Sequence, residues 1–379
     1  MPGGMNTVNK LNRMGHNTEQ TWREYVSVEL AVLEPILARR GIALDDNQPH
    51  ISGERFLMRN ITTTSGTKLI LIGTTHTGTP VVIKATRDYA GKAELQHERK
   101  CRELLHKINF AYETFSSPEE LALFTEHNFL ISIQRFIEQS SSFTERSLPE
   151  QFSYALTGLK NQESVHATTR NHYQQITRIF GVRTSQSYQD LFDGFSKFLE
   201  HNCSSKEVRT VVARARTHFC NNLIRVQQYC GFLTHTDFVP HNFRIADDKL
   251  YLLDFSSLTF GNKHEGWARF LNFMTLYNPE LEALLIRYVE DNRAPEERES
   301  LQLLRIYRLA EIITYYVRTL GSSTGSLHNL NTARIHFWRD VLEAELENTR
   351  VDHTIVAAYK KLRDTLRSDE EKMRQKNLH

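Results

Sequence analysis

The chain has 379 residues, 40% apolar and 24% charged, a composition typical of a globular protein long enough for two or three domains or lobes. Its 47 basic and 45 acidic residues give a net charge of +2, which excludes an overall electrostatic footprint for nucleic acid. The four cysteines show no C-x-x-C spacing and the 17 histidines no H-E-x-x-H arrangement, so we expect neither a zinc site nor a disulfide scaffold.

The N-terminal segment shows no targeting signal. Residues 1–17 are polar and rich in glycine and asparagine, without the apolar core of a signal peptide, so we expect them to be disordered. No apolar run approaches the roughly 18 residues that a membrane helix needs. A reducing cytoplasm is therefore the expected location, with no membrane partner.

The first part of the chain predicts a helix followed by strands. Apolar residues recur at helical spacing from Trp22 to Leu37, Gly41 stops the run, and Pro35 favours a kink. A small polar turn is expected at 62–67. Short apolar runs predict strands at 56–58, 68–73, 81–84 and 129–133.

One of these strands, V-V-I-K, ends in Lys84. An ammonium group at a strand end can contact phosphate oxygens if a carboxylate holds it. A helix is expected over 93–108, and we prefer Glu98 as the partner over Glu94 and Glu103 because it lies about one and a half turns into the helix. Taken alone, Lys84 could equally be a strand-end lysine lying on apolar surface, and Glu98 a solvated helix residue.

A change in composition after residue 138 predicts a boundary between two lobes. Residues 139–142 read Gln-Ser-Ser-Ser, which is typical of a linker, so we place a nucleotide-binding lobe with its leading helix at 18–138 and a helical lobe at 139–379. Residues 160–186 have no clear pattern and could be a substrate-facing insertion or a surface loop. Apolar periodicity predicts helices at 148–159, 188–199, 206–229, 267–277, 279–291, 296–320, 333–347 and 351–374.

The strongest pattern lies at 231–257, where two apolar runs flank polar residues at fixed offsets. His235, Asp237 and Asn242 form H-x-D-x-x-x-x-N. Asp254 opens D-F-S at the end of the second run. Two consecutive aspartates between the runs predict a tight turn that joins two short strands.

This spacing fits phosphoryl transfer. That reaction needs a carboxylate to orient the attacking hydroxyl and oxygen ligands to hold Mg²⁺ on the phosphates. Asp237 could orient the hydroxyl, and Asn242 and Asp254 could supply the hard oxygens that Mg²⁺ prefers. Each motif alone is more often structural, because H-x-D is common and asparagine and aspartate suit turns. The interpretation depends on the combination.

The lysine-ended strand, the glutamate-bearing helix, H-x-D-x-x-x-x-N and D-F-S, in this order, resemble the aminoglycoside phosphotransferase and choline kinase group within the protein-kinase-like fold. The similarity spans residues 50–320. It implies an α+β, bilobal fold with a small antiparallel-sheet N-terminal lobe and a larger, mainly helical C-terminal lobe. It also implies ATP-dependent phosphorylation of a hydroxyl on a small molecule such as an aminoglycoside or choline.

The resemblance assigns roles in the catalytic loop residue by residue. Asp237 looks like the catalytic aspartate that accepts or orients the hydroxyl proton. Asn242 and Asp254 look like the Mg²⁺ ligands, and His235 looks like the histidine that braces the loop.

The resemblance also assigns the nucleotide contacts. Lys84 looks like the lysine on the α- and β-phosphates, with Glu98 as its ion-pair partner. The other expected contacts are the backbone near Arg135 and Ile137 at adenine and the turn at Ser65 and Gly66 over the phosphates.

The chain departs from the family's pattern in four places. Its nucleotide loop has a single glycine, not G-x-G-x-x-G. Thr236 follows the histidine where the family usually has glycine, and Ser256 replaces the glycine of D-F-G. The family often carries D-L-A after the metal aspartate, whereas the matching segment at 265–268 reads E-G-W-A, which leaves that acidic role open.

Two other functions share these motifs. A protein kinase would carry A-P-E after an activation loop, and N-P-E at 278–280 superficially fits. We interpret it as a helix N-terminus, because the apolar segment before it leaves no room for a mobile loop. A nucleotide-binding pseudokinase would act as a scaffold, but it would not need the lysine, both aspartates and the asparagine together.

The expected partners are ATP, Mg²⁺ and a small hydroxyl-bearing substrate, in a monomer or a dimer. The basic run at 209–216 could contact nucleic acid, but a solvated helix face is the preferred interpretation. Acidic walls would favour a cationic substrate, with candidates Glu265, Glu280, Glu282 and Asp291. Aromatic residues that could cage a quaternary amine, although more often core, are Trp267, Tyr277, Tyr315 and Tyr316.

Overall fold

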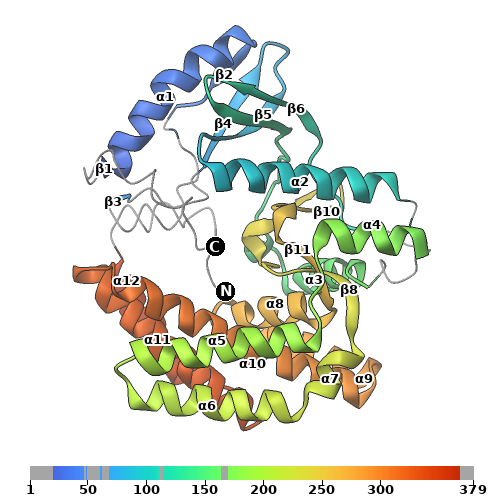
Figure 1. Ribbon diagram of the computed structural model, residues 1–379, viewed down its shortest axis with the longest axis vertical. Helices are drawn as coiled ribbons and strands as arrows, with labels where there is room; N and C mark the ends of the chain where they lie inside the picture. Colours follow the sequence, from blue (N-terminus) through green and yellow to red (C-terminus); the bar gives the residue numbers. More distant parts are fainter. Residues whose placement is uncertain are drawn as a thin grey trace, which may run out of the picture.

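In the computed structural model the chain forms an antiparallel sheet and a larger helical part, joined by the segment 136–142. Figure 1 shows the sheet and α1 at one end of the molecule, most of the helices at the other, and α2 between them. This is the α+β, bilobal architecture expected from the sequence. The structure describes residues 20–46, 48, 60–61, 68–108, 110, 114–163 and 170–367. The expected disorder at 1–17, the strand at 56–58 and the turn at 62–67 lie outside them.

The sheet has the strand order β2-β4-β5-β7-β6, and every neighbouring pair is antiparallel. Three of the expected strands are present as β4, β5 and β7. The patterns missed β2, which has only three residues, and β6, an edge strand without a buried side chain to signal it. The strands are β2 (Ile42–Leu44), β4 (Leu69–Thr75), β5 (Pro80–Thr86), β6 (Glu120–Glu126) and β7 (Phe129–Arg135).

The two faces of the sheet differ in character, because side chains alternate along each strand. One face is apolar and packs against α1 (Trp22–Arg39), which confirms the predicted leading helix. The other face carries Lys84 beside half-buried Ile70, Ile72 and Val82. The buried core residues from the strands are Ile42, Leu69, Leu71, Val81, Ile83, Ala85, Phe129, Ile131 and Ile133.

Helix α2 (Tyr89–Lys107) connects the sheet to the helical part. Its N-terminus is capped by Asp88, whose carboxylate accepts a hydrogen bond from the backbone N–H of Gly91 at 2.9 Å. The helix therefore starts four residues before the predicted 93–108, in a turn whose signal is the cap and not apolar periodicity. Its last turns contribute Leu104 and Leu105 to the core of the helical part.

The helical part follows the predicted order of helices with three differences. The expected helix at 206–229 is divided at Asn222 into α6 and α7. The unpatterned segment 160–186 contains α4, whose Ile176 and Phe180 are buried, so the segment is more than a surface loop. Helix α11 begins eight residues before the predicted 333. The helices are α3 (Leu148–Asn161), α4 (Arg170–Phe180), α5 (Ser185–Asn202), α6 (Lys206–Asn221), α7 (Leu223–Gln228), α8 (His264–Tyr277), α9 (Pro279–Asn292), α10 (Pro295–Leu320), α11 (Gly325–Leu346) and α12 (His353–Leu366).

Two small strand pairs position the motifs of residues 231–257. Strand β8 (Cys230–His235) pairs with β11 (Leu258–Asn262), and β9 (Phe243–Ala246) pairs with β10 (Lys249–Leu252). The expected turn between β9 and β10 is present, with Asp247 and Asp248 at φ of 50° and 57°. Two consecutive left-handed residues give the twist that a two-residue hairpin needs.

The N-P-E triplet begins α9, as interpreted from the sequence. Asn278 caps the helix by accepting a hydrogen bond from Leu281 N at 3.2 Å, and Pro279 is its first residue. Helix α8 fills the space between β11 and this cap, which leaves no place for an activation loop. Among the described residues, no helix is both long and apolar enough to cross a membrane.

Candidate active site

Lys84 and Glu98 form the ion pair expected from the sequence. The Lys84 ammonium on β5 lies 2.7 and 2.9 Å from the two Glu98 carboxylate oxygens on α2. Arg102, one turn further along α2, donates to Glu98 at 2.8 Å. Burial alone would raise the pKa of Glu98, but Lys84 and Arg102 hold it below its usual value. Of the rival partners, Glu103 pairs with Arg99 on the exposed side of the helix.

A second lysine–glutamate pair lies beside the first and was missed by the sequence analysis. Lys68 precedes β4 and shares a face with Ile70, which is opposite Lys84 across the β4–β5 pair. Its ammonium contacts Glu94, one helical turn before Glu98. Lys68 lies two residues before Ile70, so both side chains are on one face of the sheet, but no sequence motif distinguishes this lysine.

Asp254 connects both pairs to the helical part. Its carboxylate accepts hydrogen bonds from the hydroxyls of Ser256 at 2.5 Å and Ser257 at 3.0 Å, and Ser256 Oγ also lies 3.3 Å from Glu94. Burial alone would raise the pKa of Asp254, but Lys68 lowers it. Burial alone would lower the pKa of Lys68, but the negative charges of Asp254 and Glu94 raise it above its usual value. We call this group the lysine–glutamate cluster: Lys68, Lys84, Glu94, Glu98, Arg102 and Asp254.

The backbone of Asp254 is held in an unusual conformation by His235. Asp254 has a φ of 57°, which non-glycine residues adopt at a cost in strain. The fully buried His235 places its Nε2 3.1 Å from the carbonyl of Leu253 and 3.0 Å from that of Asp254. The histidine thus braces the turn that presents the Asp254 carboxylate.

Asp237 is held by an amide and a guanidinium. Asn242 Nδ2 donates to the backbone carbonyl of Asp237 at 2.8 Å and to its Oδ2 at 3.1 Å, and Arg269 on α8 donates to Oδ1 at 3.0 Å. Burial alone would raise the pKa of Asp237, but Arg269, His235 and Arg308 lower it to about 2. A carboxylate with such a low pKa can orient a hydroxyl group by accepting a hydrogen bond from it. It would accept the hydroxyl proton only late in a reaction of that group.

Glu265 is a buried structural residue and not a wall of a substrate site. It is fully buried and accepts hydrogen bonds from Tyr188 and Arg183, both at 2.6 Å. Arg308 lies 3.4 Å from the same carboxylate and donates to the carbonyl of Thr236 at 2.8 Å. The carboxylate therefore stabilises the start of the catalytic loop through Arg308, which corrects the expectation of an acidic wall at this position.

The other acidic candidates all lie on α9, one in a buried ion pair and two at the protein surface. Glu282 is buried and pairs with Arg305 at 2.5 Å, so it too is corrected. Asp291 lines a surface groove with Phe152 of α3, and Glu280 is exposed at the first turn of α9. A cationic substrate would have to break an existing pair to use Glu265 or Glu282.

The aromatic candidates divide into core and surface positions. Trp267 is buried in the helical core, and Tyr315 is 39% exposed on α10. Tyr277 stacks on Phe273 with ring centroids 4.2 Å apart, and Phe273 in turn lies 5.2 Å from the His241 ring in the catalytic loop. Of the four candidates, Tyr277 is thus linked to the catalytic loop by an aromatic row.

Four residues were expected to contact adenine or to lie over the phosphates, and the structure describes two of them, Arg135 and Ile137. Arg135 is the last residue of β7, and its backbone N–H donates to the carbonyl of Glu119 at 2.9 Å. Ile137 lies half-buried two residues later in the connecting segment. Ser65 and Gly66 lie outside the described residues.

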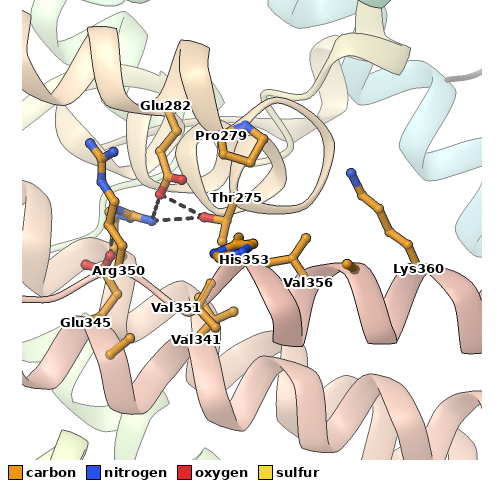
Figure 2. Close-up of a pocket in the computed structure, with 13 residues that line it drawn as sticks. Thr275, Pro279, Glu282, Val341, Glu345, Arg350, Val351, His353, Val356 and Lys360 are labelled. Carbon is orange, nitrogen blue, oxygen red and sulfur yellow. Dashed lines mark hydrogen bonds and ion pairs between the residues drawn. The ribbon is translucent and has the colours of Figure 1, made fainter.

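A second group of buried charges lies in the helical part, around Arg305. Its guanidinium contacts Glu282 at 2.5 Å, Glu345 at 2.7 Å and the Thr275 hydroxyl at 3.2 Å, and its Nε donates to Asn272 at 3.0 Å. These residues, which we call the Arg305 cluster, border a cavity of about 270 Å³ beside α12. Figure 2 shows the Glu282 carboxylate directed at Thr275, whose hydroxyl donates a hydrogen bond to it at 2.8 Å.

No dedicated metal cage is present within the described ranges, because no three histidine, cysteine, aspartate or glutamate side chains there gather to hold an ion. This agrees with a magnesium ion carried in on nucleotide phosphates, which needs only one or two protein ligands. Asp254 could provide a carboxylate to such an ion, and Asn242, whose amide nitrogen donates a hydrogen bond to Asp237, could provide its carbonyl oxygen.

Comparison with known proteins gives the fold and not the family. No protein-family model matches the sequence, and no curated protein matches it. Aminoglycoside phosphotransferase APH(4)-Ia matches in structure with a TM-score of 0.56 at 14% identity, over 84% of this chain and 98% of that one. Amicoumacin kinase hAmiN, solved with AMP-PNP, Ca²⁺ and Ami, matches at 0.52 and 11%, over 85% and 94%. Macrolide 2′-phosphotransferase type I matches at 0.51 and 14%, over 84% and 98%. The chain therefore has the fold of the aminoglycoside and macrolide phosphotransferases.

Proposed function

We propose that this protein is an ATP-dependent phosphotransferase that phosphorylates a hydroxyl group of a small molecule. The observation that supports this most strongly is the direct contact between the two halves of the site. Ser256 joins Asp254 to the helix that holds the Lys84–Glu98 pair, while His235 ties Asp254 to the strand that leads to Asp237. The groups proposed to bind phosphate, hold the metal and orient the hydroxyl are thus connected through Ser256 and His235, and phosphoryl transfer requires all three.

The face of the sheet that carries Lys84 would bind the nucleotide. Ile70, Ile72 and Val82 are half-buried on the face that carries Lys84, and they offer an apolar surface to adenine. The backbone of Ile137 would supply the hydrogen bonds to the base. Lys84 would contact the α- and β-phosphates, and Lys68 would add a second ammonium group where the chain lacks a glycine-rich loop.

Asn242 and Asp254 would hold Mg²⁺ against the phosphates. The bound ion would neutralise negative charge on the phosphates as the bond to the leaving group breaks. The two serine hydroxyls on Asp254 fix the direction of its carboxylate, and His235 fixes its backbone. Ser256 therefore performs a positioning task where D-F-G would have glycine.

Asp237 would orient the attacking hydroxyl of the acceptor. Its Oδ1 is bound by Arg269 and its Oδ2 by Asn242, so the carboxylate has one fixed orientation. With a pKa of about 2 it is ionised at neutral pH and always ready to accept a hydrogen bond. The proton would pass to it as the oxygen–phosphorus bond forms.

The acceptor is better described as neutral or anionic than as polycationic. Glu265 and Glu282, two of the four acidic candidates, are buried in arginine pairs. Arg269 places a positive charge directly beside the base. The phosphotransferases of similar fold are named for aminoglycoside, macrolide and amicoumacin acceptors, and the charges here favour the less basic kinds. Location in the cytoplasm stays a prediction from the sequence.

The proposal is tested by thermal unfolding of the purified protein with Mg·ATP, with Mg·GTP as control. A ligand that binds only the native state stabilises it by RT ln(1 + [L]/Kd), about 2.7 kcal/mol at a hundredfold excess over Kd. A magnesium-dependent rise in Tm with ATP is expected, followed by ADP formation in a screen of hydroxyl compounds. No shift with either nucleotide would remove the basis for the proposal.

A further inference from the structure

Gln162, the residue after α3, reaches into the strand that leads to the catalytic loop. It is completely buried, and its Oε1 accepts a hydrogen bond from Thr234 Oγ1 at 2.8 Å and from the backbone N–H of His235 at 3.3 Å. The two ends of these contacts are 72 and 73 residues apart in sequence. A side chain outside the motif thus contacts two consecutive residues of β8.

The N–H of His235 needs such a partner because of the strand geometry. In the β8–β11 pair, the N–H of Thr236 donates to the carbonyl of Ser257 at 2.9 Å. Successive N–H groups of a strand point to opposite sides, so the N–H of His235 points away from β11. A buried N–H without an acceptor is costly, and Gln162 supplies the acceptor.

The glutamine occupies space that any side chain at position 266 would fill. A Cβ atom on Gly266 would lie 2.2 Å from Gln162 Oε1 and 2.9 Å from its Cδ, which is too close for either atom. The N–H of Gly266 also donates to Thr234 Oγ1 at 3.0 Å. The ends of α3, β8 and α8 therefore meet at one carboxamide, and a side chain at 266 excludes it.

We infer that Gln162 is a positioning residue for the metal site, acting through His235. The bond to the His235 N–H fixes the backbone of that residue, and its ring fixes the turn of Asp254 at 3.0 Å. This inference rests on the proposed function, because it assigns a role within the same magnesium and nucleotide site.

Two glutamines at opposite ends of α3 allow a matched test. Gln162→Leu keeps the side-chain size and removes the acceptor. Gln151→Leu makes the same change at another buried glutamine of α3, whose amide donates to the carbonyls of Thr144 and Arg146 away from the catalytic loop. Both variants are compared with the unmodified protein for Tm and for AMP-PNP affinity with and without Mg²⁺.

The magnesium dependence of nucleotide binding is the decisive readout. We expect Gln162→Leu to reduce the gain in AMP-PNP affinity on adding Mg²⁺ by about tenfold, the scale of one buried hydrogen bond. Gln151→Leu should lower Tm and leave that gain within about twofold of the unmodified protein. An equal gain in all three proteins would overturn the inference. AMP-PNP binding without any effect of Mg²⁺ in the unmodified protein would instead overturn the proposed function.

A swap of the two positions provides a second, independent test if the leucine variant folds poorly. Gly266→Asp alone should lower Tm strongly, because the new side chain collides with Gln162. Adding Gln162→Gly removes the collision and lets the aspartate accept from Thr234 and His235 in place of the glutamine. We expect the double variant to recover both Tm and the magnesium-dependent gain. A double variant no better than Gly266→Asp would contradict the proposed anchoring.

Discussion

Two groups of charges in the described part of the molecule differ in what their arginines and lysines leave uncovered. In the Arg305 cluster, one guanidinium contacts two carboxylates, a hydroxyl and an amide, all from helices of the same lobe. In the lysine–glutamate cluster, the Asp254 carboxylate accepts hydrogen bonds from two serine hydroxyls among the described residues, and its pKa is lowered by the two ammonium groups of Lys68 and Lys84. In this second cluster Lys68, Glu94 and Asp254 are half-buried, and Asp254 is connected to the H-x-D-x-x-x-x-N segment through His235.

The two clusters differ in the way that a structural charge cluster is expected to differ from one that binds a ligand. Buried charges add little net stability when complete, but removing one partner is strongly destabilising. The Arg305 cluster closes on itself and joins α8, α9, α10 and α11. The lysine–glutamate cluster connects the sheet to the helical part, and its Asp254 carboxylate is the group proposed to hold the metal ion. A cavity alone is therefore a poor guide to function here, because the cavity of about 270 Å³ lies beside the closed cluster.

The largest effect is expected from Asp237→Asn. The substitution preserves the size and shape of the side chain and weakens its hydrogen bond with Arg269. The hydroxyl of the acceptor loses the negatively charged group that would orient it. Turnover should fall by about three to four orders of magnitude, the upper range for a general base. The measurement is ADP formation with a substrate found in the screen. A loss below tenfold would mean that Asp237 is not the base.

Breaking the closed cluster should affect folding and not nucleotide binding. Arg305→Met leaves Glu282 and Glu345 buried without their partner, so the free energy of unfolding should fall by about 3–5 kcal/mol. Nucleotide affinity per folded molecule should not change. Arg298→Met is the control, because Arg298 pairs with Glu290 on the surface, where less than about 1 kcal/mol is expected. Urea unfolding and AMP-PNP titration measure the two quantities, and a similar loss in both variants would contradict the comparison.

Removing either lysine of the open cluster should weaken Mg·AMP-PNP binding. We expect a larger loss for Lys84→Met than for Lys68→Met, about a hundredfold against about tenfold, because a charge-assisted hydrogen bond contributes about 1.5–3 kcal/mol. AMP lacks the β- and γ-phosphates, so its affinity should fall less. Lys92→Met is the control, since this lysine bonds to Asn128 at the surface. A loss of affinity in the Lys68 variant that is equal for AMP and Mg·AMP-PNP would limit Lys68 to a structural ion pair.

The smallest effect is a shift in pH dependence. Asp237 orients the hydroxyl only when ionised, so its contribution is present above its pKa and is lost as the pH falls through it. With the pKa lowered to about 2, kcat should be independent of Asp237 titration between pH 5 and 8. Arg269→Gln removes the largest lowering influence, so the acid limb should move upward in pH. An unchanged limb would show that Arg269 does not set the ionisation of the base.

Much of the fold could be predicted from local sequence patterns, because an apolar stripe indicates a helix and alternating apolar and polar residues indicate a strand. The leading helix, three central strands, the Asp247–Asp248 turn and most C-terminal helices were predicted. Edge strand β6 was not, since it buries no side chain. The break at Asn222 was not, since the apolar period continues across it.

The site was predictable only where spacing within one segment carries it. His235, Asp237, Asn242 and Asp254 lie within twenty residues, and Lys84 ends a marked strand. Arg269, Arg308 and Gln162 reach the same loop from other helices. Nothing in their own sequence neighbourhood distinguishes them, because their partners are decided by tertiary packing. For the same reason Glu265 and Glu282 looked available to a substrate until their arginine partners were seen.

The most direct test of the account compares two aspartate variants by calorimetric titration with Mg·AMP-PNP. Asp254→Ala removes the charged metal ligand and should abolish the magnesium-dependent part of binding. Asp237→Asn should bind Mg·AMP-PNP nearly as well as the unmodified protein, because Asp237 serves the acceptor and not the nucleotide. Equal affinity of both variants would contradict the division of roles between the two carboxylates, and with it the proposed phosphotransferase site.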